Sequence, residues 1–431
     1  MQVIHRSALQ SRSFRVAMAL LLMVAAACGG EGAGTTTTVD AGTSTSLDTA
    51  TTTTESSTPE TTTSEATTTA ATQEPLRVGG VFALSGSGAS LGQPVAFGIE
   101  LAFTQADFEV AGRPIEFITA DSAGNPDTGL QETRRLLDEG LDIWAGWEFS
   151  GVALAGIPEV ERSGLPWIVA YASDDSITPM LGERGFRAGT TSSQLVNGTL
   201  NLIQEQGWTQ AAMIGHEITA FRTIVEAIKE RTELGLLQET WVGFDVIDFS
   251  PFLAQLPIDD GDVLLALMTA NVVQFLGQLD ELGIKDRTEV LAMPATVSES
   301  LLPEVCDQAE GMFTGIGYAW GIDNPVNVEF RTAYEEKFGV PPNDGSFYGY
   351  VTGLAILSAL EATNGNAEDV DALVAALEEI EVESPVGPYG FDENHVQESP
   401  YYSAQVQRVD GQCHVMPLTE FPDVDTYPPS A

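Results

Sequence analysis

A short run of small residues near the start of the folded part could receive a ligand. Residues 77–93 read RVGGVFALSGSGASLGQ. The apolar run from Val78 to Leu84 predicts a buried strand, and the periodic pattern from Leu91 onward predicts a helix. The loop between them, Ser85-Gly86-Ser87-Gly88, leaves backbone N–H groups free for an anionic or polar ligand group. An ordinary tight turn that binds nothing is the alternative.

The same stretch contains a serine in a hydrolase-like pattern. Gly88-Ala-Ser90-Leu-Gly92 fits the G-x-S-x-G elbow of serine hydrolases. That elbow needs its serine at a sharp turn directly after the strand, whereas Ser90 lies six residues past Leu84. His395 or His414 would have to complete a triad from the C-terminal tail. A secreted serine hydrolase is therefore only a minor alternative.

The first residues of the chain have the pattern of an export signal. Three arginines give a basic start, and residues 16–27 form an apolar run of 12 residues. That run is too short to span a bilayer and fits the apolar region of a signal peptide. It ends in Ala25-Ala26-Ala27-Cys28-Gly29, which resembles the bacterial lipobox, although Ala25 stands where a larger aliphatic residue is usual.

We therefore predict that residues 1–27 are removed and that Cys28 carries lipid at the outer face of the cytoplasmic membrane. Cleavage by an ordinary signal peptidase beside an incidental cysteine is the alternative. The next segment, from Glu31 to Glu74, contains 19 threonines and neither lysine nor arginine. Such a composition cannot bury enough apolar surface to offset the entropy of ordering. Residues 28–74 are expected to form a disordered tether that lifts the folded part off the membrane.

The charge balance excludes some partners. The 431-residue chain has a formal charge of −44, and loss of the three signal arginines leaves 15 basic residues against 62 acidic ones, or −47. Such a surface repels nucleic acid, so no DNA- or RNA-binding role is expected. The length is sufficient for two or three domains with substantial cores.

The cysteines that remain after Cys28 predict a disulfide. Cys306 and Cys413 would share an oxidising compartment, where pairing is natural, and two separate buried thiols are the alternative. A metal is not expected, because no histidine has zinc-ligand spacing with these cysteines. Gly86, Gly88 and Gly92 are spaced one residue too widely for a dinucleotide site, so no cofactor is expected either.

From residue 75 onward, strand-like and helix-like patterns alternate. The first series has expected strands at 115–120, 142–146 and 166–171, with helices at 95–106, 127–139 and 151–163 between them. A second series begins with a helix at 195–206. Its later segments include an expected helix at 222–234 and an expected strand at 240–244, three helices between 325 and 380, a Gly/Pro turn at 387–390 and a hairpin-like tail at 401–415. Such alternation predicts α/β lobes with parallel sheets covered on both sides.

Taken together, the order and spacing of several segments resemble a known family. It comprises the substrate-binding proteins of ABC importers of the branched-chain amino acid and amide (Leu/Ile/Val-binding) type, which have the type I periplasmic-binding-protein fold. Besides RVGGVFALSGSGASLGQ, the segments that carry the resemblance are Asp121-Ser-Ala-Gly-Asn-Pro-Asp, AGWEFSGVALAGIPEVERSGLPWIVAYAS, Phe186-Arg187, TIVEAIKE, FRTAYEEKFGVPP, YGYVTGLAILSALEA, Ser384-Pro385-Val386-Gly387 and Phe391-Asp392.

The resemblance implies two doubly wound α/β lobes joined by three hinge crossings, which close on a ligand. The first lobe would comprise residues 75–192 and 319–384, and the second lobe residues 193–318 and 385–431. The crossings would fall near 189–194, 317–320 and 384–390. The implied function is non-catalytic capture of a small polar solute and its delivery to ABC importer permease subunits. A ligand-sensing lipoprotein with the same fold is the alternative.

The resemblance also implies where a ligand would bind. In relatives, the loops that match 147–151 and 172–174 hold an amino acid's carboxylate, and Ser150 and Ser173 match those positions well. The positions that hold the ammonium are occupied here by Thr191, by Ala220 or Phe221, and by Asn271 or a neighbour, so the family's acid and phenol are missing. The expected ligand-binding residues are Ser85, Trp147, Glu148, Phe149, Ser150, Ala172, Ser173, Asp174, Thr191, Phe221 and Asn271.

These substitutions put an ordinary α-amino acid ligand in doubt, because a buried ammonium needs a counter-charge. Glu148, Asp174 and Asp175 add negative charge on the first-lobe side, and nearby aromatic residues could form walls. Carboxylates with aromatic walls favour a cationic, amide or ring-bearing ligand. The alternative for Glu148 and for Asp174 is a solvated surface carboxylate on an acid-rich protein.

Overall fold

The computed structural model describes residues 74–422. The signal peptide expected at 1–27, the lipidation site Cys28 and all but the last residue of the tether therefore lie outside the described residues. Among the helices that are described, none is long and apolar enough to cross a bilayer.

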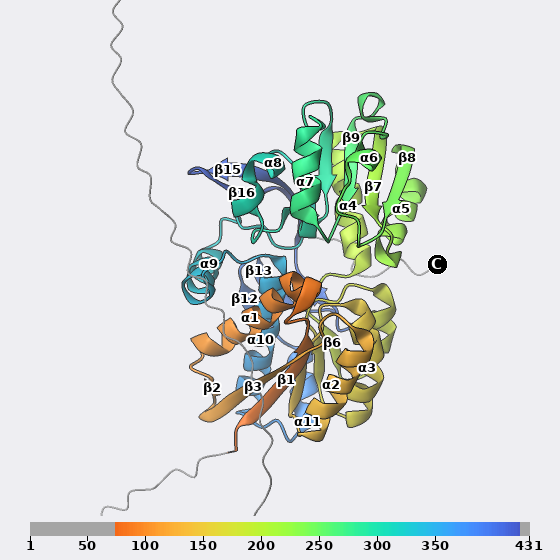
Figure 1. The fold of residues 1–431 in the computed structure, drawn as a ribbon. Coiled ribbons are helices and arrows are strands. Elements are labelled where there is room, and N and C mark those ends of the chain that lie inside the picture. The colour runs from red at the N-terminus through yellow and green to blue at the C-terminus, as the bar shows by residue number, and fades with distance from the viewer. Residues whose placement is uncertain (1–73, 423–431) are drawn as a thin grey trace, which may run out of the picture. The chain divides into compact units, whose positions relative to one another are not determined.

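The first lobe is built on a six-stranded sheet in the order β2-β3-β1-β4-β5-β6 (Figure 1). All neighbours pair in parallel except β2, which is antiparallel to β3. The strands are β1 (Leu76–Phe82), β2 (Glu109–Val110), β3 (Arg113–Asp121), β4 (Ile143–Gly146), β5 (Trp167–Val169) and β6 (Gly185–Arg187).

Alternation along these strands explains why helices cover both faces of the sheet. Ile143 and Ile168 point to one face and belong to the cluster that includes the first helix. Trp144, Trp167 and Val169 point to the other face and pack with the second and third helices. The helices of this lobe are α1 (Ala89–Gln105), α2 (Pro126–Asp138), α3 (Ser150–Ser163), α9 (Pro325–Phe338), α10 (Asp344–Ala362) and α11 (Val370–Glu378).

Helices α1 and α10 come from distant parts of the chain and pack closely. A Cβ atom on Gly98 of α1 would lie 2.1 Å from the carbonyl oxygen of Ser346 on α10, and one on Gly349 would lie 2.1 Å from that of Val95. Only glycine allows the two backbones this approach. The segment after the second crossing is thereby fixed to the N-terminal part of the first lobe.

The second lobe has a seven-stranded sheet in the order β16-β15-β11-β10-β9-β7-β8. Strands β7 to β11 are parallel, and β15 and β16 add an antiparallel hairpin at one edge. These strands are β7 (Gln210–His216), β8 (Gly235–Val242), β9 (Val263–Leu267), β10 (Glu289–Ala292), β11 (Phe313–Ile316), β15 (Tyr401–Val409) and β16 (Gln412–Phe421).

Helices cover both faces of this sheet as well. Met213 and Leu265 pack with Ile203 of α4 and Ile224 of α5, while Leu264 belongs to the cluster that holds α7 and α8. The helices are α4 (Ser192–Gln206), α5 (Thr219–Arg231), α6 (Ser250–Leu253), α7 (Val272–Glu281) and α8 (Leu302–Ala309).

Two neighbouring elements of the second lobe differ from the sequence-based expectation. The helix predicted at 222–234 ends at Arg231, and the strand predicted at 240–244 begins at Gly235. Thr232 takes an extended conformation and stops the helix, and its hydroxyl bonds to the carbonyl oxygen of Ile228 and accepts from the N–H of Leu234. Pairing with β7 therefore starts earlier than the β-propensity of the sequence indicated.

Residues 385–398 pack with the first lobe, although the sequence-based boundary assigned them to the second. They form β13 (Gly387–Phe391) and β14 (Gln397–Glu398), which join β12 (Val382–Ser384) in a small sheet. Val396 forms a bridge with Arg187 of β6, and the hydroxyl of Tyr389 donates to the carbonyl oxygen of Ala188 at 2.9 Å. The third crossing consequently lies at 399–400, and the expected Gly/Pro turn is part of a strand.

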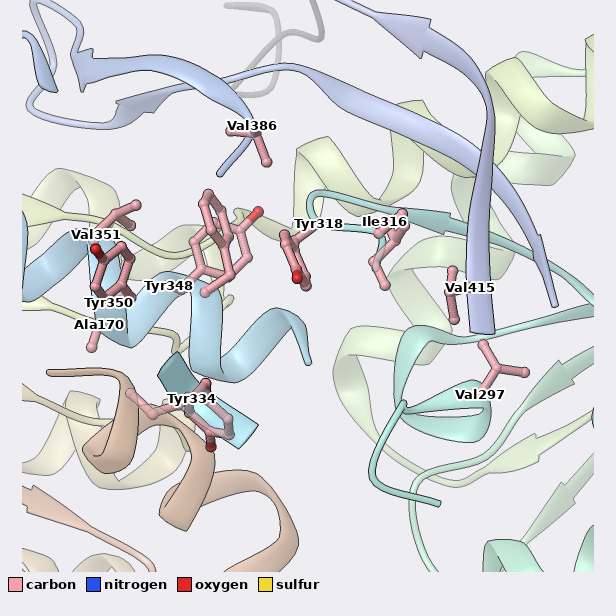
Figure 2. Close-up of a cluster of buried hydrophobic side chains, with 14 of the residues drawn as sticks. Ala170, Val297, Ile316, Tyr318, Tyr334, Tyr348, Tyr350, Val351, Val386 and Val415 are labelled. Carbon is pink, nitrogen blue, oxygen red and sulfur yellow. The ribbon is translucent and has the colours of Figure 1, made fainter. Parts of the chain in front are cut away.

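The hydrophobic core continues through the crossings. One cluster of buried residues includes side chains of both lobes. Figure 2 shows part of it, with Tyr348, Tyr350 and Val351 on the α10 ribbon and Ile316 and Tyr318 at the end of β11. The Tyr318 ring stacks on Phe347 at 5.3 Å between ring centroids. The segment that leaves the second lobe is thereby packed against a first-lobe helix.

The expected disulfide between Cys306 and Cys413 is present. It links α8 to the β15–β16 hairpin and joins two second-lobe residues that are 107 positions apart in the sequence. Such a link stabilises a fold chiefly by restricting the unfolded chain.

We expect the double replacement Cys306→Ser/Cys413→Ser to lower the free energy of unfolding by up to about 4–5 kcal/mol, from the chain entropy of a loop of this length. The urea midpoint of the purified protein measures the loss. A reductant should lower the midpoint of the wild-type protein and leave that of the double variant unchanged. Two titratable thiols in the native, untreated protein would contradict the assignment.

Candidate ligand-binding site

An enclosed cavity lies at the carboxyl ends of strands from both sheets. Its volume is about 70 Å³, and a smaller cavity of about 30 Å³ shares Tyr171 and Asp344 with it. Ligands of open α/β sheets bind at this edge. The residues that line the larger of the two are Glu148, Tyr171, Ser173, Thr190, Leu195, Pro294, Gly317, Asp344 and Tyr401.

Two larger hollows lie elsewhere and are open to solvent. One of about 740 Å³ follows the amino ends of β7, β9, β10 and β11, and one of about 660 Å³ lies beside the disulfide. Ligands of such folds bind at the carboxyl ends of the strands, so the first hollow lies at the opposite edge of the sheet. We assign the candidate site to the enclosed cavity, since it lies at the carboxyl ends of strands of both sheets and residues of both lobes line it.

Trp147 determines which way the loop after β4 presents its side chains. Its backbone has a φ of +68°, which is unusual for a bulky residue. The indole is fully buried, with ring centroids 4.8 Å from Trp144 and 6.3 Å from Trp167. Its carbonyl oxygen accepts from the N–H groups of Tyr171 and Ala172 at 3.1 Å. The ring therefore packs in the core, and the following residue, Glu148, lines the cavity.

Glu148 is a buried carboxyl group, with 6 % of its surface exposed. Its Oε1 accepts from the N–H of Ala83 at 2.8 Å. Burial raises the pKa of Glu148 to about 7, against the lowering effect of the Ala83 and Glu148 N–H groups, and the charge of Asp121 raises it further. The group is therefore close to half-protonated at neutral pH.

Asp344 is the second carboxyl group in the lining. It is the first residue of α10, directly after the capping residue Asn343, and it accepts a 2.8 Å hydrogen bond from the hydroxyl of Tyr171. Burial raises the pKa of Asp344, while the bonds from Tyr171 and from the N–H of Gly345 lower it. Asn343 donates to Ser298 of the second lobe at 3.1 Å, so the lobes meet at the start of this helix.

The rings of Tyr171 and Tyr401 form part of the remaining wall. Tyr348 is outside the lining and packs beside it, with its ring centroid 5.9 Å from that of Tyr171 and a bond to Thr190. Tyr401 donates to the carbonyl oxygen of Gly315 at 2.9 Å. Among the described residues that line the two cavities, none is lysine, arginine or histidine. Nothing in the lining neutralises the two carboxyl groups.

Several first-lobe candidates form hydrogen bonds in the loops that border the cavity. Ser150 Oγ accepts from the N–H of Asp174, and the Asp174 carboxylate turns to the N–H and hydroxyl of Ser176. Ser173 lines the cavity, and Ala172 accepts from the buried guanidinium of Arg187 at 2.8 Å. Burial lowers the pKa of Arg187 to about 10.

The opening loop does not present an empty anion cradle. The Asp121 carboxylate accepts from the N–H of Leu84 at 2.8 Å and from the hydroxyl of Ser85 at 2.5 Å. Ser85 is exposed and does not line the cavity. The ring of Phe149, which precedes α3, lies over Gly88.

The candidates expected at the ammonium-binding positions have other contacts. Thr191 caps α4 by accepting from the N–H of Gln194, and Phe221 packs in the core of α4 and α5. Asn271 donates to the carbonyl oxygens of Phe244 and Val246. The second lobe lines the cavity with Leu195, Pro294, Gly317 and Tyr401 instead.

Sequence reasoning missed Asp344. The capping box of Asn343 and Ser346 was a readable signal for a helix start. It could not reveal that this helix start lies beside Tyr171, which is 173 residues away in the chain.

Two α/β lobes that enclose a cavity lined by polar and aromatic side chains define a binding protein for a small solute. Residues 75–412 match the sequence profile of the periplasmic binding protein family. The Leu/Ile/Val-binding protein homolog 6 of Brucella suis biovar 1 is 23% identical over 359 residues, which cover 79% of this chain and 90% of that protein.

Two solved structures have the same fold. An ABC transporter substrate-binding protein from Sphaerobacter thermophilus matches with a TM-score of 0.77 at 27% identity, over 82% of this chain and 100% of that one. A second structure is a solute-binding protein of an ABC transporter from Rhodopseudomonas palustris BisB5, in complex with 3,4-dihydroxybenzoic acid. It matches with a TM-score of 0.76 at 26% identity, over 82% of this chain and 98% of that one.

The chain belongs to the periplasmic binding protein family. It has the type I fold and is an extracytoplasmic solute-binding protein of the kind that serves ABC transporters. The sequence-based prediction of family, fold and general function is confirmed.

The raised pKa of Glu148 predicts a pH-dependent cost of folding. Between its ordinary value of 4.5 and about 7, the folded protein binds more protons here than the unfolded chain. This group therefore lowers stability as the pH rises through that window. Glu148→Gln should raise the free energy of unfolding over wild type by up to about 3 kcal/mol above that window, and by little near its lower end.

Urea unfolding of the ligand-free protein at the two ends of the window measures the difference. The matched control is Glu183→Gln, because Glu183 is exposed in the same lobe. An equal effect of Glu148→Gln at both ends would show that Glu148 titrates normally.

Proposed function

We propose that this protein captures a small polar solute, such as an amino acid, an amide or a related compound, and delivers it to the permease subunits of an ABC importer. The enclosed cavity with lining residues from both lobes carries the proposal. A solute held there touches both lobes at once, so binding would favour the closed form.

We propose further that the protein acts without catalysis. Ser90 lies in the first turn of α1, a position that does not match the sharp elbow of a hydrolase. The described histidines have other partners. His414 Nδ1 lies 3.1 Å from Glu299, His395 Nδ1 lies 3.0 Å from the carbonyl oxygen of Gly185, and His216 Nδ1 accepts from the N–H of Thr269.

Attachment to the outer face of the membrane through lipidated Cys28 completes the proposal. It is supported by the apolar run at 16–27 and by the lipobox-like residues before Cys28. The Thr-rich tether would then let the binding lobes reach a permease.

Solute binding should raise the Tm of the full-length protein by mass action. A thermal-shift screen of amino acids, amides, urea, polyamines, amidines and aromatic acids tests this. At least one of these compounds should stabilise the protein in a concentration-dependent way. If none does, the proposed function fails for those classes.

The location of the site can be tested whatever the solute. Leu195 lines the cavity from α4, and Leu195→Trp should fill a space of about 70 Å³. We expect this variant to lose the thermal shift of any compound identified in the screen. Leu237→Trp is the matched control, because Leu237 is 41% exposed on β8. An undiminished shift in a folded Leu195→Trp protein would move the site elsewhere.

The anchor has its own test. Cys28→Ser should prevent incorporation of labelled fatty acid and release the protein from the membrane fraction. Labelling that persists in this variant would contradict Cys28 as the lipid-bearing residue.

A further inference from the structure

The lining of the cavity has an unbalanced charge. Glu148 and Asp344 come from different elements, and both line the space of about 70 Å³. Apart from their own residues' N–H groups, Glu148 interacts with the N–H of Ala83, and Asp344 with the hydroxyl of Tyr171 and the N–H of Gly345. Hydrogen bonds of this kind do not supply a positive charge. A buried and a half-buried carboxyl group without a cation cost free energy, which a cation between them would recover.

A buried cation next to the lining residue Ser173 already has partners within the protein. The Arg187 guanidinium donates to the carbonyl oxygens of Asp174 and Ala172 and to the hydroxyl of Thr178. It holds the loop after β5 and is not part of the cavity lining. An anionic ligand would therefore meet two carboxyl groups and no cationic side chain in the described lining.

The size and walls of the cavity restrict which ligands could bind there. A space of this volume holds about five water-sized atoms. Tyr171 and Tyr401 line it, and the face of a tyrosine ring attracts a cation. The site thus combines two acceptors for N–H groups with aromatic surface in a small enclosed volume.

We propose that the cavity selects a compact organic cation of the amidinium, guanidinium or primary ammonium class, held between Glu148 and Asp344 against the tyrosine rings. This inference rests on the proposed function and specifies its solute. A cationic ligand would distinguish this protein from the related Rhodopseudomonas palustris protein, whose structure contains an aromatic acid.

Proton linkage follows from the same geometry. A cation bound at Glu148 favours the ionised carboxylate, so binding displaces a proton wherever Glu148 is protonated. The other titratable groups around it are Asp121 at the end of β3, Tyr171 after β5, Asp344 on α10 and Tyr401 on β15. The affinity for a cation should fall by about tenfold per pH unit below the Glu148 pKa.

Three compounds with the same number of non-hydrogen atoms test the proposal, namely acetamidinium, acetamide and acetate. Calorimetric titration of the full-length protein above the Glu148 pKa measures their dissociation constants, with methylammonium and methylguanidinium as further cations. We expect at least one of the three cations to bind ten times or more tightly than acetamide, and acetate not to bind.

Two variants connect the result to the carboxyl groups. Glu148→Gln and Asp344→Asn should each weaken binding of the cation by about tenfold or more, the loss of one charged partner. Asp245→Asn makes the same change at an exposed residue and should leave binding unaltered. If Asp344→Asn does not fold, Glu148→Gln still decides, since it is expected to be at least as stable as wild type.

The outcomes separate this inference from the proposed function. If acetamide, acetate or a member of the screen other than a cation binds and the three cations do not, the protein is a solute-binding protein and the cation assignment is wrong. Binding of all three cations no more tightly than acetamide would also overturn it. If neither these compounds nor the screen binds, both fail for the classes tested.

Discussion

The conformation of Trp147 is the constraint on which the site depends. Its N–H donates to Val81, its carbonyl oxygen accepts from Tyr171 and Ala172, and its ring is locked among other tryptophans. One residue thus connects the ends of β1, β4 and β5. The positive φ is a strained backbone state that persists because these contacts together determine it. The same turn directs Glu148 to the cavity and leads into α3.

Carboxylates serve two opposite purposes around this site. The Asp121 carboxylate is bonded to the N–H and hydroxyl groups of the opening loop, and these bonds lower its pKa against the opposing effect of burial. Glu148 is buried and Asp344 is half-buried, and their removal from water raises the pKa of both. The Asp121 carboxylate therefore stabilises the fold. The ionised forms of Glu148 and Asp344 instead lower the free energy of unfolding. Polar groups that oppose stability and face an enclosed space are typical of binding sites.

The crossings between the lobes are themselves packed. Tyr389 donates to the backbone of Ala188 in the first crossing, and Tyr318 of the second crossing stacks on Phe347 of α10. The small sheet of β12 to β14 attaches the approach to the third crossing to the first lobe. The start of α10, beside Asp344, is another place where both lobes meet.

The sequence by itself determined the alternation of strands and helices, the family, the cysteine pair and the first-lobe loop that contains Glu148. These features depend on local periodicity, composition and motif spacing, which a chain carries without its fold. The tertiary structure decided whether the side chain of Trp147 or that of Glu148 faces the cavity. This depends on the backbone angle φ of Trp147, which contacts with distant residues maintain. It also placed Asp344 beside Tyr171, used Thr191 and Asn271 for structural bonds, and attached residues 385–398 to the first lobe. Contacts between segments so far apart in the chain arise only when the sheets and helices pack.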